Sequence, residues 1–206
     1  MDYENPNNNG LGTMINLSPQ MKAEGGLKMN TENTHGINLS SLYHFECFDN
    51  EGNLKWEEYE KNIVVNEGLQ YVLDIAFKDG DKSTSWFCGL KVGAATLAIA
   101  TDTLSNHGGW DEALLNTYTV GGNTTRAPVN WGSINTTHQR LDNSSSKCIF
   151  DIVTGDEVHG ALLCDNNGVT NLTTGMLYGA VNFANPRTVV TGDQLQVTIT
   201  VQAADG

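Results

Sequence analysis

The chain has 206 residues, of which 39% are hydrophobic and 17% are charged, and its formal net charge is −13. An acidic excess of this size repels nucleic-acid phosphates and anionic lipids, so the composition argues against nucleic-acid binding and against membrane binding. The length fits one β domain of ordinary size or two small domains.

Residues 1–40 are predicted to form an extended N-terminal arm, ahead of a β-sandwich domain over residues 41–206. Gly, Asn and Pro interrupt this region too often for a regular element. Its apolar surface is too small to offset its own ordering entropy. The arm is therefore either a disordered tail or a segment laid on a neighbouring subunit, and we expect the latter. The expected anchors are Leu11, Met14, Ile15, Leu17, Met21, Leu27 and Met29.

A hairpin is predicted next. Tyr43, Phe45 and Cys47 alternate with polar residues, which is the period of a half-buried strand. The turn-forming residues 49–53 follow, and residues 54–59 alternate again.

Residues 66–77, NEGLQYVLDIAF, have the pattern of a helix. Asn66 is the expected N-cap, and Gly80 the residue expected to close the C-terminus. Five apolar residues fall on one stripe, which should cover one end or edge of the β domain. The stripe consists of Leu69, Val72, Leu73, Ala76 and Phe77.

Further strands are predicted over residues 85–92, 127–131, 147–153, 158–164, 176–183 and 194–202. Residues 93–125 are less regular, and Pro128 favours an edge position for its strand. Short strands separated by frequent turn signals indicate an antiparallel, jelly-roll-like sandwich. The predicted fold class is therefore all-β, with one short covering helix and the extended arm.

The four cysteines are far apart and form no Cys-x-x-Cys pair, so we expect reduced, mostly buried thiols. The first residues lack a basic region followed by an apolar core, so no signal peptide is expected. No apolar run approaches the roughly 20 residues of a membrane span.

Catalytic motifs are hard to find in this sequence. The five histidines have no metal-ligand spacing, and no nucleophile elbow, P-loop or dinucleotide fingerprint is present. The clustered carboxylates, such as Glu57, Glu58 and Glu60, are expected on solvated faces, although a glycosidase-like pair stays open. Trp110 with Asp111 could form a sugar-binding surface, whereas Trp86 and Trp131 are expected to pack in the core.

Five segments, taken in order, resemble small structural proteins of tailed bacteriophage virions. That family typically has an "NEGL" helix, a W-[YF]-x-G-L strand, an R-P-x-W segment and a closing G-D-x-L-x-V strand. The likeness covers about residues 60–206 and leaves out the N-terminal arm; it also differs at Ala127, where Pro follows one residue later. The segments here are NEGLQYVLD (66–74), WFCGL (86–90), RAPVNW (126–131), VHGALL (158–163) and RTVVTGDQLQVTITV (187–201).

The resemblance implies a virion protein that is not an enzyme and takes no cofactor. With the acidic domain and the arm, it leads us to expect a decoration (cement) protein on the outer surface of a phage head. Its partners would be the major capsid protein or neighbouring virion subunits, and a homo-oligomer, a trimer, is expected. The alternatives are a tail, neck or head-fibre component, or a carbohydrate- or receptor-binding module.

Overall fold

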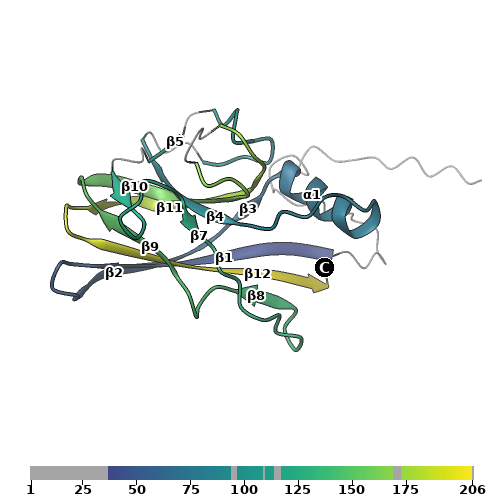
Figure 1. The fold of residues 1–206 in the computed structure, drawn as a ribbon, viewed down its shortest axis with the longest axis horizontal. Coiled ribbons are helices and arrows are strands. Elements are labelled where there is room, and N and C mark those ends of the chain that lie inside the picture. The colour runs from purple at the N-terminus through teal and green to yellow at the C-terminus, as the bar shows by residue number, and fades with distance from the viewer. Residues whose placement is uncertain (1–36, 94–96, 109, 114–116, 169–172, 206) are drawn as a thin grey trace, which may run out of the picture.

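The computed structural model describes residues 37–93, 97–108, 110–113, 117–168 and 173–205, and Figure 1 shows their arrangement. Its elements are β1 (Ile37–Phe48), β2 (Leu54–Lys61), β3 (Ile63–Val64), α1 (Asn66–Phe77), β4 (Phe87–Val92), β5 (Asp111–Glu112), β6 (Tyr118–Thr119), β7 (Ala127–Pro128), β8 (Arg140–Asp142), β9 (Cys148–Ile152), β10 (Asp156–Cys164), β11 (Leu177–Val189) and β12 (Gln194–Asp205).

Two antiparallel sheets form a sandwich, which confirms the predicted all-β class. The first sheet, named sheet A here, has the order β2-β1-β12-β9-β6, with β8 also paired to β12. The second, sheet B, has the order β3-β11-β10-β4-β5, with β7 paired to β4. In Figure 1 the long strands β1 and β12 lie side by side below sheet B. The first and last strands of the described chain are therefore neighbours.

The main core lies between the two sheets. The alternating residues of β1 point into it, as the period-2 pattern predicted, and Tyr43, Phe45 and Cys47 are fully buried. On β12 the buried partners are Leu195, Val197 and Ile199. Phe45 packs edge-on against Phe183 of β11, with ring centroids 4.6 Å apart. Contacts of this kind join the sheets because each sheet presents one continuous apolar face.

The predicted hairpin is confirmed, because β1 pairs with β2 in antiparallel register. Asp49 closes the turn: its Oδ1 accepts hydrogen bonds from the backbone N–H groups of Glu51 and Asn53, at 2.9 and 2.8 Å. One boundary differs from the prediction. Strand β1 begins at Ile37, so residues 37–40 belong to sheet A and not to the arm. Their pairing with the end of β12 supplies the backbone hydrogen bonds that the sequence pattern alone did not reveal.

The helix has the predicted span, but its ends differ from the prediction. Val65 is the N-cap and makes no side-chain capping bond; the Asn66 N–H instead donates to the Ala100 carbonyl at 2.7 Å. At the other end Asp79, with φ 60°, adopts the left-handed conformation that Gly80 was expected to supply. Glu67, in the first turn, connects the helix to β11, because its side chain accepts a hydrogen bond from the Leu177 N–H at 2.9 Å.

The predicted apolar stripe of the helix is only half correct. Leu69 and Val72 pack against the core, whereas Leu73 is 57% exposed and Phe77 is 76% exposed. The residue of α1 that is buried is Gly68. In Figure 1 the helix lies at one end of the sandwich and contacts β11 with its first turns. The later part of the stripe is exposed because Gly68 lies close to the β11 backbone, and this contact turns the remaining apolar residues away from the sheets.

We predict that Gly68→Ala destabilises the protein. Helix propensity alone would favour Ala by about 1 kcal/mol. A methyl group at position 68 would overlap the Tyr178 carbonyl oxygen and come within 2.9 Å of the Tyr178 Cα. Overpacking against backbone costs about 1–3 kcal/mol, so the melting temperature should fall. Gly108→Ala is the control, since nothing lies within 4 Å of its added methyl group. A higher melting temperature for Gly68→Ala would contradict this close approach.

Candidate functional site

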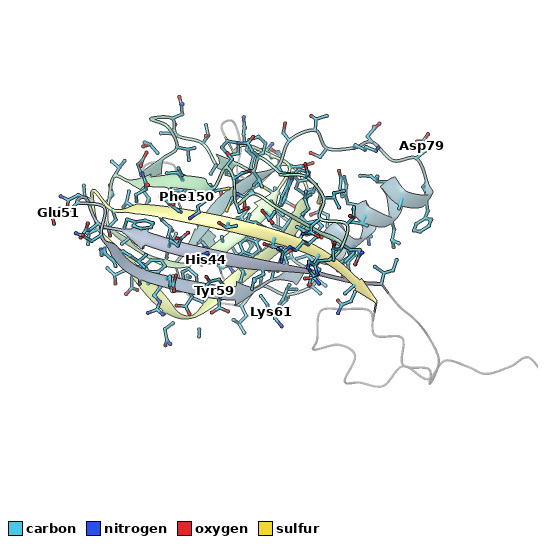
Figure 2. The ribbon with its side chains drawn as sticks, turned by 90° about the horizontal axis from the view of Figure 1, so that it is seen from below. His44, Glu51, Tyr59, Lys61, Asp79 and Phe150 are labelled. Carbon is cyan, nitrogen blue, oxygen red and sulfur yellow. The ribbon has the colours of Figure 1, made fainter. Side chains whose placement is uncertain are left out.

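The outer face of sheet A is a broad surface that the other described elements leave uncovered, and Figure 2 shows it from below. Two cross-strand rows run over β2, β1 and β12. Tyr59, His44 and Thr198 form one row, and Lys61, Leu42 and Thr200 form the next. The outward residues of β12 from position 194 to 202 are Gln and Thr only. The middle of this face therefore carries hydrogen-bonding groups without charge.

An aromatic pair stands at the edge of this face. The rings of His44 and Tyr59 stack with centroids 4.0 Å apart and planes inclined by 4°, and Tyr59 is 57% exposed. Glu57 Oε2 lies 3.4 Å from His44 Nε2, and Glu46 forms an ion pair with Lys147. Exposed tyrosines are enriched in protein interfaces because they combine a large apolar ring with a polar tip. The outer face of sheet A is thus the candidate interaction surface.

The predicted arm joins the domain at one end of this sheet. Ile37, the first residue of β1, is 80% exposed and pairs with Asp205 at the far end of β12. The seven predicted anchors Leu11, Met14, Ile15, Leu17, Met21, Leu27 and Met29 lie outside the described residues. Their contacts with a neighbouring subunit stay a prediction.

A hollow of about 470 Å³ lies beside the β1–β2 turn and is lined in part by Asp49, Asp151 and Asp193. Each carboxylate already has partners. Asp49 binds the turn amides, Asp151 accepts from Gln194 Nε2 at 2.9 Å, and Asp193 pairs with Lys55 while accepting from the Val190 N–H. These bonds hold the hairpin ends together, so the hollow does not present a free carboxylate pair of the kind that a glycosidase uses.

The outer face of sheet B is covered instead of exposed. Residues 97–108 and Trp110 lie over it and contribute Ala98, Leu104 and Trp110 to a second apolar cluster with Leu162 and Leu177. Strand β4 is consequently buried on both faces. This second layer contains most of the buried charged groups among the described residues.

A buried ion pair links β5 to the residue before β7 in this layer. Arg126 is fully buried, and its Nε and Nη2 each donate to Glu112 carboxylate oxygens at 2.6 Å. Its Nη1 donates to the Asn166 carbonyl at 2.9 Å and lies 3.2 Å from Cys164 Sγ. Gly89 leaves room for this pair, because a Cβ there would lie 2.5 Å from Glu112 Oε1. The Glu112 carboxylate is thus fully used as the partner of Arg126.

Trp110 belongs to the same layer and is only 2% exposed. Its Nε1–H donates to Asp102 Oδ2 at 2.9 Å, and His107 stacks on it with ring centroids 3.8 Å apart. The expectation of a sugar-binding surface built on Trp110 was therefore wrong: the indole is buried by its neighbours in the covering loop. Trp86 and Trp131 do pack against the main core, as expected.

Lys91 projects from β4 into this layer and is fully buried. Its Nζ lies 2.6 Å from Asn182 Oδ1 and 4.5 Å from the centroid of the Trp110 ring. Burial lowers the pKa of Lys91 to about 8, although the charge of Asp102 opposes that shift. Neither Lys91 nor Asn182 was singled out from the sequence. The presence of a lysine within an otherwise apolar strand was the sequence signal that could have identified Lys91.

The remaining reactive groups are enclosed or dispersed. Cys47, Cys88, Cys148 and Cys164 are free and buried, as expected, and burial raises the pKa of Cys164 to about 12 despite the nearby Arg126. Such thiols are poor nucleophiles. Within the described ranges, no three His, Cys, Asp or Glu side chains form a group suited to a metal ion. The described part of the chain also has no helix long and apolar enough to cross a bilayer.

The chain matches no known family model and no curated protein sequence. The likeness to phage virion proteins therefore rests on the five sequence segments. In the structure these segments supply helix α1, strand β4, strand β7 with the buried Arg126, strand β10, and the end of β11 with the following turn and most of β12.

We predict that Glu112→Gln lowers the free energy of unfolding by about 3–5 kcal/mol, because it leaves the buried Arg126 without its countercharge. The double variant Glu112→Gln/Arg126→Met should lose less than Glu112→Gln alone, since it removes the uncompensated charge. Urea denaturation measures both. Lys78→Ala is the control: it breaks the exposed Asp74–Lys78 pair and should change little. Equal losses for Glu112→Gln and Lys78→Ala would show that the buried pair does not hold the layer.

Proposed function

We propose that this protein is a non-enzymatic structural component of a tailed-phage virion, and that it decorates the outer surface of the head. The observation that supports this most is the difference between the two sheets. Sheet B is covered on its outer side, whereas the outer face of sheet A is open, uncharged along β12 and edged by Tyr59 and His44. Such a face suits a flat protein partner better than a small substrate.

The arm extends this surface in the proposed mechanism. Residues 1–36 continue from Ile37 at the end of sheet A, so the arm and the sheet face can engage adjoining subunits of one shell. Binding that occurs only on the assembled shell stabilises that shell by mass action, without any chemical step. The net charge of −13 favours a capsid surface with basic groups. Self-association as a trimer would place three such faces around a local symmetry axis.

Deleting residues 1–36 should leave a folded domain, because β1 begins at Ile37, but should abolish binding to assembled heads. Co-sedimentation with purified heads of the encoding phage measures binding, and circular dichroism verifies the fold. The control is the full chain on the same heads. If the truncated domain binds as tightly as the full chain, the arm does not act as the clamp.

Tyr59→Ala should weaken head binding by at least tenfold while leaving the melting temperature nearly unchanged, since truncating a tyrosine that anchors an interface costs about 2 kcal/mol or more. The change lies on the solvent side of β2, away from the core. Ser133→Ala, at an exposed loop position, is the matched control. Undiminished binding by Tyr59→Ala would move the docking surface elsewhere on the domain.

A tail or neck position is the second candidate, because the sequence resemblance applies equally to those locations. Copy number separates the two. A shell decoration protein occurs in far more copies than the subunits of a tail or neck ring, and quantitative densitometry of purified virions distinguishes them.

A further inference from the structure

Lys91 and Asn182 meet on the outer face of sheet B, although they lie on strands that do not pair with each other. Strand β10 runs between β4 and β11, and both residues are in register with Gly160 of that strand. Gly160 has no side chain to separate them and adopts a φ of 149°. The Lys91 side chain passes over this gap and brings its Nζ within 2.6 Å of Asn182 Oδ1. An amine and a carboxamide are thus held in contact under the covering loop.

The surroundings of Lys91 favour its neutral, nucleophilic form. The side chain is fully buried and makes no ion pair with any described residue. Glu112 lies opposite Lys91 on β5, but both of its carboxylate oxygens bind Arg126. With a pKa of about 8, a substantial fraction of the amine is unprotonated at mildly alkaline pH. The Trp110 ring at 4.5 Å shields the amine from bulk water.

The surroundings of Asn182 favour attack on its carboxamide. Its Oδ1 accepts a second hydrogen bond, from the Ala98 backbone N–H at 3.1 Å. A fixed donor at this oxygen polarises the carbonyl group and stabilises the negative charge that develops when a nucleophile adds to the carbon. Asp102 is 3% exposed and is held in the same loop by the Ile99 N–H and Trp110 Nε1. Its negative charge acts on Lys91 and opposes the effect of burial on the pKa of the amine.

We propose that Lys91 and Asn182 join in an intramolecular amide bond with release of ammonia. The neutral Nζ adds to Cγ of Asn182, and a C–N bond forms. The proton that Nζ loses passes to the departing amide nitrogen, the original C–N bond breaks, and ammonia leaves. One amine and one primary amide give one secondary amide and one ammonia, so the step needs no oxidant, reductant or external reactant. This modification is independent of the proposed virion function.

The bond would join β4 to β11 across β10 and would lie beneath the 97–108 loop. It would close the chain between positions 91 and 182 into a covalent loop, which restricts the unfolded state in the way that a disulfide does. All four cysteines are free, so the described structure contains no disulfide that would do the same. A covalent tie of this kind would suit a protein that must resist mechanical load.

The mass of the purified full chain, measured after denaturation, tests the proposal. We expect the wild-type protein, after incubation at mildly alkaline pH, to be lighter than its sequence by one ammonia. Proteolysis should give one branched peptide that contains both Lys91 and Asn182. Amine labelling of the unfolded protein should leave Lys91 unlabelled. A full sequence mass for folded wild-type protein would overturn the proposal.

Variants separate this bond from other losses of ammonia, such as succinimide formation at Asn167–Gly168. Lys91→Met and Asn182→Ala should each restore the full sequence mass. Lys61→Met and Asn185→Ala, at exposed positions on β2 and β11, should keep the mass loss. If Lys91→Met still loses ammonia, the loss comes from another asparagine and the proposal fails. The wild-type peptide map decides the same point if a variant does not fold.

Discussion

The Glu112–Arg126 pair is the contact on which the outer layer of this protein depends. Sheet B is buried on both faces, so every charged group that projects from its outer side must find a partner inside the protein. Two 2.6 Å hydrogen bonds provide that partner and connect β5 to the residue before β7. The pair lies in the same outer layer as Trp110 and Lys91, which are also buried.

The two sheets therefore differ in how their outer faces are packed. Sheet B provides an interior with two cores, one facing sheet A and one beneath the 97–108 loop. Sheet A packs only one face against the core, and its other face is open (Figure 2). The described elements thus leave the outer side of sheet A open and place the second apolar cluster on the outer side of sheet B.

The segments that resemble virion proteins occupy positions that set the fold. Gly68 allows α1 to approach the Tyr178 backbone, Gly89 leaves room for Glu112, and Arg126 completes the buried pair. Close packing and ion pairing explain the identity of these residues without any ligand. A likeness that rests on them concerns residues that shape the fold and does not by itself indicate a binding site.

The sequence by itself determined the local elements. Alternation in β1 and β12 gave the sandwich class and the inward residues, because side chains in a strand point to opposite faces with a period of two. The span of α1 and the turn at Asp49 also followed from local patterns. Only the tertiary structure decided what covers each face. A strand such as β4 looks one-sided in sequence, and the loop that buries its other face comes later in the chain.

The same reason explains the site residues. The contact of Lys91 with Asn182 joins positions 91 apart in sequence, and it exists because β10 places Gly160 between them. Likewise Trp110 looked exposed in a Gly-rich turn, and is buried because that turn folds over sheet B. Composition and periodicity record what each residue prefers, but strand order determines which distant residues meet, and strand order is settled by the packing of the whole chain.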